Sequence, residues 1–278
     1  MFGVLLMLAG TFFEELSTSI GKIGIRRHLE SPFSFGFINS SLVTIAFIVI
    51  LVIRRNGLVF SSASLPLLAI RVVLEMLTAS VTLHAIAKAD RSTYGFLRTL
   101  TIPLILVYDL VLAYKFDYLQ LLGVAFIVVA LLFLFMNHGL SRKGAALSLL
   151  SAFLASLTIS IYKYSITNYN SPEIDQSIVN FFLLVFFFVM AKYVYKEDAV
   201  KAFWHRRSLG QSMIAALGSL VESYAYLFAP ASVIVAAKRS LAVFWSVLSG
   251  KVAFHERKLA IKLIALFLCA VGLSLLAM

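Results

Sequence analysis

Charged residues lie well inside the long apolar runs of this sequence, and such side chains can bind protons or polar solutes. They are Glu14, Glu15, Arg71, Glu75, Arg98, Glu222, Lys238 and Arg239. A charged side chain at the centre of a membrane-spanning helix costs about 2.5 to 3.5 kcal/mol. Uncompensated, the group would cost on the order of 20 kcal/mol or more, beyond typical fold stabilities. We therefore expect these side chains to be paired, neutralised or placed in a wet cavity.

Spacing along the runs suggests partners for some of these groups. Arg71 and Glu75 are four residues apart and share a helix face, so they form either a structural ion pair or part of a substrate site. Glu222 has no cation near it in its own run, which favours a polar cavity over a packed, protonated side chain. Glu14 is expected to exchange protons. Glu15 points about 100° away from it and faces helix packing instead.

Composition places these runs in a membrane. Hydrophobic residues make up 61% of the 278, charged residues 13%, and the mean hydropathy is +0.97. These values exclude a soluble domain. A membrane-spanning helix needs roughly 20 mostly apolar residues. The sequence predicts ten such helices, near residues 3–25, 33–53, 66–86, 92–113, 118–136, 144–166, 174–194, 209–228, 231–250 and 259–278.

The ten predicted helices fall into two similar halves. Leu16–Lys22 matches Leu157–Lys163 in residue type and order, and Arg98-Thr99-Leu100 matches Arg239-Ser240-Leu241. We therefore predict one five-helix repeat over 1–136, a linker over 137–143 and a second repeat over 144–278. Because five is odd, the second repeat must cross the membrane in the opposite direction. Inverted repeats are typical of secondary transporters, whose sites lie between the repeats near the membrane midplane.

The inversion gives the paired cations two interpretations. Lys22 and Arg98 would lie toward one membrane face, and their counterparts Lys163 and Arg239, with Lys238, toward the other. They are either two symmetry-related cationic gates or side chains that snorkel to headgroups. Pro103 alone among the prolines lies inside a predicted helix and implies a kink there, which either lines a cavity or is a packing feature.

The loops set an expected orientation and exclude other classes of protein. Lys and Arg concentrate in the connections after the odd-numbered predicted helices, which places both termini outside the cell membrane by the positive-inside rule. The net charge of +11 reflects these helix ends, so we expect no nucleic-acid partner. No metal, phosphate-loop or nucleophile motif occurs, so we expect no enzyme, cofactor or metal. The single cysteine, Cys269, is expected to be a small packing residue.

Local motifs add a family resemblance. Ala237-Lys238-Arg239-Ser240, followed by Phe254-His255-Glu256 before the last predicted helix, resembles EamA-type members of the drug/metabolite transporter superfamily. The resemblance covers nearly the whole chain and implies ten spans in two inverted halves. In the first half, Tyr114-Lys115-Phe116-Asp117 replaces the acidic turn.

The first predicted helix has a second likeness. Glu14, Thr18 and Lys22 have the spacing of the first helix in small multidrug resistance transporters. That resemblance implies that Glu14 binds both protons and substrate. Ala155 stands at the repeat counterpart of Glu14, so any coupling would be asymmetric.

These features together predict a secondary transporter of a small organic solute, working by alternating access in the plasma membrane. A lipid or lipid-carrier translocase on the same scaffold, or a membrane scaffold, is the alternative. The predicted substrate or proton site comprises Glu14, Thr18, Lys22, Glu75, Arg98, Lys163, Glu222, Lys238 and Arg239. Glu14→Gln is expected to fold and lose proton-driven transport, and Glu15→Gln to do less harm. The substrate, its direction of movement and the oligomeric state do not follow from the sequence.

Overall fold

The chain is a bundle of helices. The computed structural model describes residues 2–54, 58–105, 118–137, 139–225, 231–256 and 258–276, and within these ranges it contains no strand. The α-helices are α1 (Phe2–Arg26), α2 (Pro32–Ile53), α3 (Leu65–Lys88), α4 (Arg91–Arg98), α6 (Tyr118–Met136), α7 (Ala145–Asn168), α8 (Pro172–Val189), α9 (Ala199–Phe203), α10 (Arg206–Ala225), α11 (Ala231–Val252) and α12 (Leu259–Leu276). A 3-10 turn covers Ser62–Ser64 and a π turn covers Met190–Val194.

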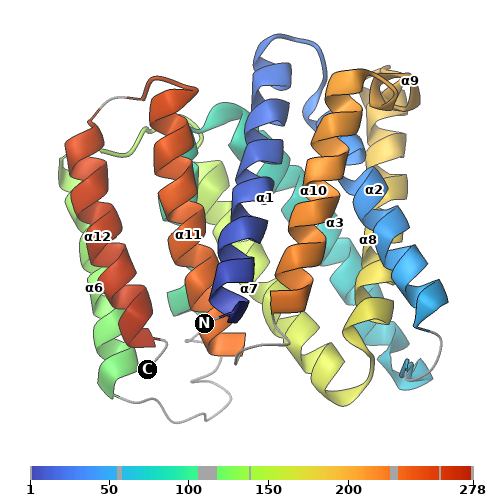
Figure 1. Ribbon diagram of the computed structural model, residues 1–278, viewed down its shortest axis with the longest axis horizontal. Coiled ribbons are helices and arrows are strands. Elements are labelled where there is room, and N and C mark those ends of the chain that lie inside the picture. Colours follow the sequence, from blue (N-terminus) through green and yellow to red (C-terminus); the bar gives the residue numbers. More distant parts are fainter. Residues whose placement is uncertain are drawn as a thin grey trace.

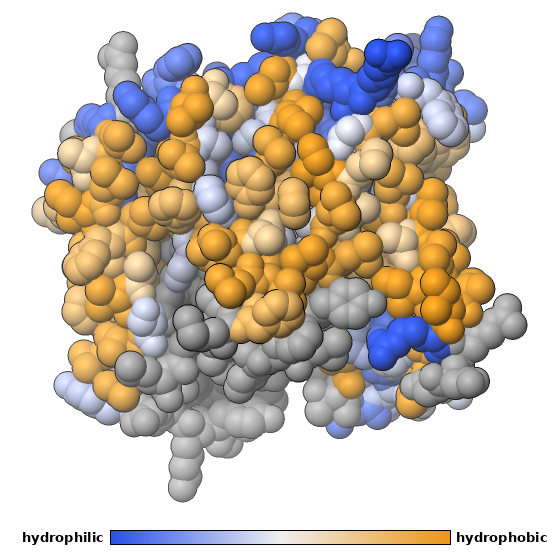
Figure 2. Space-filling view, viewed as in Figure 1, coloured by the Kyte–Doolittle hydropathy of each residue, from blue (hydrophilic) through white to orange (hydrophobic). Residues whose placement is uncertain are grey.

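Four described segments are long and apolar enough to cross a membrane: Pro32–Ile53, Ser62–Lys88, Ala145–Ile166 and Pro172–Val194. On the face shown in Figure 2, apolar side chains cover the middle of the described surface, and polar ones gather along the upper edge. The prediction of an all-helical membrane protein is confirmed. The two ends of the chain lie on the same side of the bundle, at the bottom of Figure 1.

Helices from distant parts of the sequence pack in a regular scheme. α1 packs on α10 and α11, and α7 packs on α3 and α4. α2 contacts α8, and α6 contacts α12. α1 ends near the top of Figure 1, whereas α7 ends near the bottom, where the chain turns into α8. The first and second halves of the chain are therefore interleaved, and each half completes the surroundings of the other.

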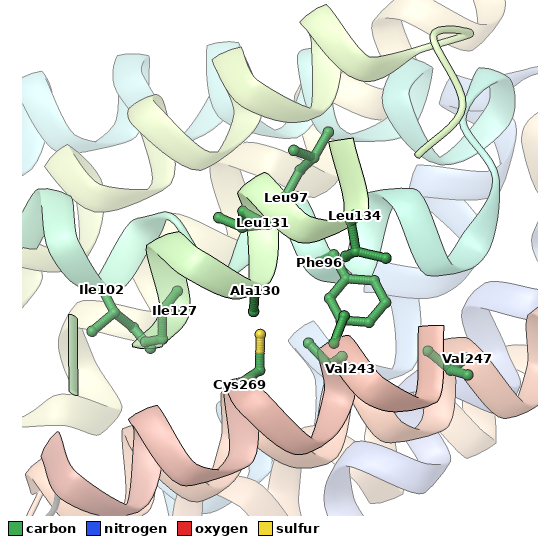
Figure 3. Close-up of a cluster of buried hydrophobic side chains, with 11 residues drawn as sticks. Phe96, Leu97, Ile102, Ile127, Ala130, Leu131, Leu134, Val243, Val247 and Cys269 are labelled. Atoms are coloured by element: carbon green, nitrogen blue, oxygen red, sulfur yellow. The ribbon is translucent and has the colours of Figure 1, made fainter. Parts of the chain in front are cut away.

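The contact between α6 and α12 depends on small residues. Ala130, Ala265 and Cys269 are fully buried in the cluster of Figure 3, where the Cys269 thiol points toward Ala130. A Cβ atom added at Gly272 would lie 2.6 Å from the carbonyl oxygen of Gly123. Cys269 is thus a packing residue. Small side chains let these two backbones approach, which drives helix association in lipid.

The predicted break near Pro103 is present, but its geometry differs from the expectation. α4 ends at Arg98, where the sequence predicted one helix over 92–113. Thr99 and Leu100 form a tighter turn, and the Thr99 carbonyl accepts a hydrogen bond from the Ile102 amide at 3.0 Å. Pro103 has no amide hydrogen to donate to the Thr99 carbonyl, but the Ile102 amide pairs with that carbonyl instead. Residues 106–117, which include Asp109, lie outside the described part of the chain.

Residues 195–208, which we call the basic connector, were predicted to be a loop but contain short regular elements, including α9. α8 ends at Val189, the π turn follows, and α10 already begins at Arg206, where the sequence predicted residue 209. The Glu197 carboxylate accepts hydrogen bonds from the Ser31 amide at 3.0 Å and from the Ser34 hydroxyl. A carboxylate at the first turn of α2 stabilises that helix end, because the helix dipole is positive there.

Candidate functional site

Two carboxylates share one lysine where α1, α10 and α11 meet. The Lys238 ammonium on α11 donates a hydrogen bond of 2.6 Å to Glu222 Oε2 on α10. Its nitrogen also lies 3.5 Å from Glu14 Oε2 on α1. The sequence of α10 places no cation near Glu222, because its partner Lys238 is on another helix, 16 residues along the chain. The three side chains, all predicted site residues, form what we call the shared-lysine cluster.

The two carboxylates of the cluster differ in exposure. The Glu222 side chain is 11% exposed, whereas that of Glu14 is 56% exposed. Glu14 lies near the middle of α1, and the charges of Arg98 on α4 and Arg239 on α11 both act on it. Charged groups from several helices thus surround an accessible carboxylate. This arrangement is suited to binding a proton or the charged group of a solute.

A close approach of two helix backbones places Glu14 beside Glu222. A Cβ atom added at Gly10 would lie 2.5 Å from Glu222 Cγ and 3.2 Å from the Gly218 carbonyl oxygen. A Cβ atom at Gly218 would lie 3.1 Å from the Gly10 carbonyl oxygen and 3.2 Å from the Glu14 amide nitrogen. Only glycine permits this distance between α1 and α10. The two carboxylates are therefore held together by the crossing itself.

A second polar region connects α3, α4 and α7. The Arg98 guanidinium donates to the Tyr94 hydroxyl at 2.7 Å and to the Ser151 hydroxyl at 3.4 Å. The Glu75 carboxylate on α3 lies within the electrostatic reach of Arg98 and beside Thr158 of α7. Arg98 therefore links this region to the shared-lysine cluster, and both predicted residues belong to the polar interior.

The predicted pair of Arg71 with Glu75 is only a minor contact. Their closest atoms are 4.0 Å apart, whereas Arg71 contacts Asp175 of α8 directly. Asp175 also accepts a hydrogen bond of 2.6 Å from the Ser165 hydroxyl. Arg71 and Asp175 are both almost completely buried. This ion pair joins α3, α7 and α8, so Arg71 has a structural partner that the local spacing did not reveal.

Lys22 lies apart from the cluster. Its side chain is fully buried, donates to the Ala89 carbonyl at the end of α3 and lies 5.2 Å from the centre of the Phe254 ring. It does not snorkel to headgroups. Thr18 does not contribute its hydroxyl to the cluster either, because that group donates to the Glu14 carbonyl at 2.6 Å. The Lys163 side chain lies outside the described part of the chain.

Glu15 belongs to a layer of polar contacts at the same end of the bundle as Lys22. Both nitrogens of one edge of the Arg91 guanidinium donate to its carboxylate, and the Ser249 hydroxyl donates to it at 2.5 Å. The Arg91 side chain is 3% exposed and that of Glu15 is 11% exposed. The sequence predicted Glu15 to face helix packing and placed Arg91 in a loop. Neither residue type nor spacing indicated this buried pair.

Glu256 caps α4 from a distant loop. Asp90 precedes the helix without capping it by its side chain, whereas the Glu256 carboxylate accepts from the Arg91 amide at 2.5 Å and from the Ser92 hydroxyl. Burial acts to raise the pKa of Glu256, but hydrogen bonds from Lys262 and Ser92 and the Lys262 charge outweigh it and hold this pKa below its usual value. Glu256 is thus an anion that fixes the α3–α4 turn to the end of α11 and the start of α12.

Sequence comparisons do not place this chain in a family. No family model matches the chain, and no curated protein sequence matches it. Among the described residues there is no group of three or more histidine, cysteine, aspartate or glutamate side chains able to hold a metal ion. The chemistry of the site must therefore be argued from the shared-lysine cluster and its surroundings.

Proposed function

We propose that the chain is a secondary-active transporter, rather than an enzyme, that moves a small organic solute together with protons by alternating access. The observation that carries this proposal is the shared-lysine cluster, with its accessible Glu14 carboxylate near the middle of α1. Ionisable groups at this depth in a membrane protein are costly and typically mark solute pathways or proton relays. The cluster is also contributed by both halves of the chain.

The helix packing supports two inverted five-helix repeats in this proposal. If α1 corresponds to α7, α2 to α8, α3 to α10, α4 to α11 and α6 to α12, the observed contacts come in equivalent pairs. The contact of α1 with α10 corresponds to that of α7 with α3, and α1 with α11 to α7 with α4. The contacts of α2 with α8 and α6 with α12 map onto themselves. We take this as support for ten spans on a drug/metabolite transporter scaffold resembling EamA-type proteins.

Charge balance supports proton coupling in this proposal. Lys238 compensates Glu222 at 2.6 Å, so at 3.5 Å it stabilises Glu14 more weakly. Arg98 and Arg239 also act electrostatically on Glu14, so a change of charge at this carboxylate is felt by cations on α4 and α11. A proton that binds Glu14 changes the charge that the solute meets at this carboxylate, and a solute that binds there changes the charge that the proton meets. Competition of this kind couples the two movements.

The distribution of basic residues supports an orientation of the protein in the membrane. The connections at the top of Figure 1 carry the basic connector and the loop with Glu256, and they would face the cytoplasm. Both termini would then lie outside, in a multi-pass plasma-membrane protein.

A transport assay tests this proposal. Thermal-shift screening of the purified protein identifies solutes that bind the folded state, and uptake of the best labelled solute into proteoliposomes is then measured with and without a pH gradient. We expect Glu14→Gln to fold and to lose gradient-driven uptake. Leu16→Ala, an exposed neighbour on α1, should retain it. Full gradient-driven uptake by Glu14→Gln would contradict proton coupling through this residue.

A lipid translocase on the same scaffold is the second candidate. An apolar groove of about 370 Å³ runs between α11 and α12, beside the Lys238-Arg239 segment, and offers a lateral path. Its lining residues are Ser240, Leu241, Phe244, Leu263, Leu266, Phe267 and Ala270. Movement of a fluorescent phospholipid between leaflets of proteoliposomes, abolished by Glu222→Gln, would favour this candidate over a soluble solute.

A further inference from the structure

We propose that the groove between α1 and the first turns of α10 binds one anionic glycerophospholipid from the leaflet that faces the basic connector. The groove has a volume of about 380 Å³. It is lined by Ile20, Ile23, Arg206, Arg207, Gly210, Gln211 and Ile214. Cations lie at one end and isoleucines along the walls, as an amphipathic ligand requires. This lipid is a bound partner, and its site does not depend on what the protein transports.

The cationic end of the groove fits a phosphate. α10 begins at Arg206, and the first amide groups of a helix lack intrahelical acceptors and attract anions. The Arg206 side chain is exposed, and the described contacts give it no carboxylate partner. Arg207 is already engaged, since it donates to Glu30 at 2.6 Å and to the Ile20 carbonyl at 3.0 Å. Arg206 is therefore the side chain available for a phosphate.

A buried polar side chain lines the groove without a partner. Gln211 is fully buried, and within the described residues neither its amide nitrogen nor its amide oxygen has a hydrogen-bond partner. A primary amide offers two donors and an acceptor, so leaving it unpaired in an apolar setting is unfavourable. The ester and glycerol oxygens of a phospholipid can accept from it. This is the second observation that points to a polar ligand.

Distances along α10 match the layers of a bilayer leaflet. Gln211 lies five residues beyond Arg206, roughly 7 Å along the helix axis, and Ile214 lies eight residues beyond, roughly 12 Å. The headgroup region is about 5 to 7 Å thick on each side of the hydrocarbon core. Arg206 would thus meet the phosphate, Gln211 the ester region and Ile214 an acyl chain. Trp204, 68% exposed two residues before α10, marks the interface at the expected depth.

Gly210 leaves the space that the ligand would occupy. A Cβ atom added there would meet nothing within 4 Å. Packing therefore does not require a glycine at this position, in contrast to the Gly10–Gly218 crossing on the same pair of helices. A bulky side chain at position 210 should fill the groove without displacing the protein around it.

Lipid retention tests the proposal. The purified full-length protein is incubated with equal amounts of dioleoyl phosphatidylglycerol and dioleoyl phosphatidylcholine, and bound lipid is counted by native mass spectrometry. We expect one phosphatidylglycerol to be retained in preference to phosphatidylcholine. Arg206→Gln should weaken its retention about fivefold, the effect expected of one cation near an anionic headgroup. Gly210→Phe should abolish it.

Two control variants distinguish lipid bound in the groove from lipid attracted generally to the basic connector. Lys201→Gln removes one exposed cation from the same connector outside the groove, and Leu217→Phe adds bulk on an exposed face of α10. Both should retain lipid as the wild type does. Equal loss in Lys201→Gln and Arg206→Gln, full retention in a folded Gly210→Phe, or equal retention of the two lipids would overturn the proposal. Thermal unfolding of each variant verifies that it folds, and Gly210→Ala provides a milder filling.

Discussion

Two adjacent glutamates on α1 should respond in opposite ways to the same substitution. Glu15→Gln leaves the Arg91 guanidinium, whose side chain is 3% exposed, without its ion-pair partner. Breaking a buried ion pair from one side costs about 3 to 5 kcal/mol. Glu14→Gln removes a carboxylate that is 56% exposed and 3.5 Å from a lysine that keeps Glu222 as its partner. A loss of at most about 1 kcal/mol follows for that variant.

Thermal unfolding in detergent measures this contrast. Since about 1 kcal/mol shifts the melting temperature by roughly 2 to 4 °C in a chain of this size, Glu15→Gln should melt on the order of 10 °C lower than wild type. Adding Arg91→Gln removes the uncompensated charge and should recover part of the loss. Equal melting temperatures for Glu14→Gln and Glu15→Gln would refute the reasoning. Glu15→Gln is therefore expected to be milder than Glu14→Gln in its effect on transport, but not in its effect on stability.

Further predictions concern pH, packing and topology. Burial raises the pKa of Glu30, in the α1–α2 loop, from 4.5 to about 7 even though Arg207 opposes the shift. Between these two pH values the folded state holds a proton that the unfolded state has lost. The free energy of unfolding should therefore fall by roughly 3 kcal/mol as pH rises from about 4.5 to 7. Chemical denaturation at several pH values should show this fall in the wild type and a flatter profile in Glu30→Gln. Gly10→Ala should cost about 1 to 3 kcal/mol through overpacking, whereas Gly210→Ala should gain up to about 1 kcal/mol; chemical unfolding of both variants compares them. In intact cells, Val200→Cys on a Cys269→Ser background should resist a membrane-impermeant thiol reagent, and ready labelling would reverse the proposed orientation.

Hydropathy and helix-end signals predicted most of the helices. The predicted helix over 118–136 coincides with α6, and the prediction over 3–25 differs from α1 by one residue at each end. The largest differences occur where backbone geometry departs from a regular α-helix. These are the turn after Arg98 and the π turn over Met190–Val194, because periodicity carries little information about local hydrogen-bond patterns.

Charge pairing was less predictable than helix position. Glu14, Glu222 and Lys238 were all predicted site residues, and the structure brings these three together. Arg71 was predicted to pair with Glu75, because spacing along one helix is visible in a sequence and contacts between helices are not. Asp175 was passed over for the same reason, since it lies in the first turn of α8, where an acidic residue is common.

The cap on α4 comes from a residue that is synthesised much later than the helix itself. Arg91 and Glu256, joined by a hydrogen bond, are 165 residues apart in the sequence. At a synthesis rate of about 5 to 20 residues per second, roughly 8 to 33 s pass between the making of one partner and the other. During that interval the α4 amides and the Ser92 hydroxyl lack their acceptor. The cap on α4 therefore cannot form until the segment leading into α12 has been made.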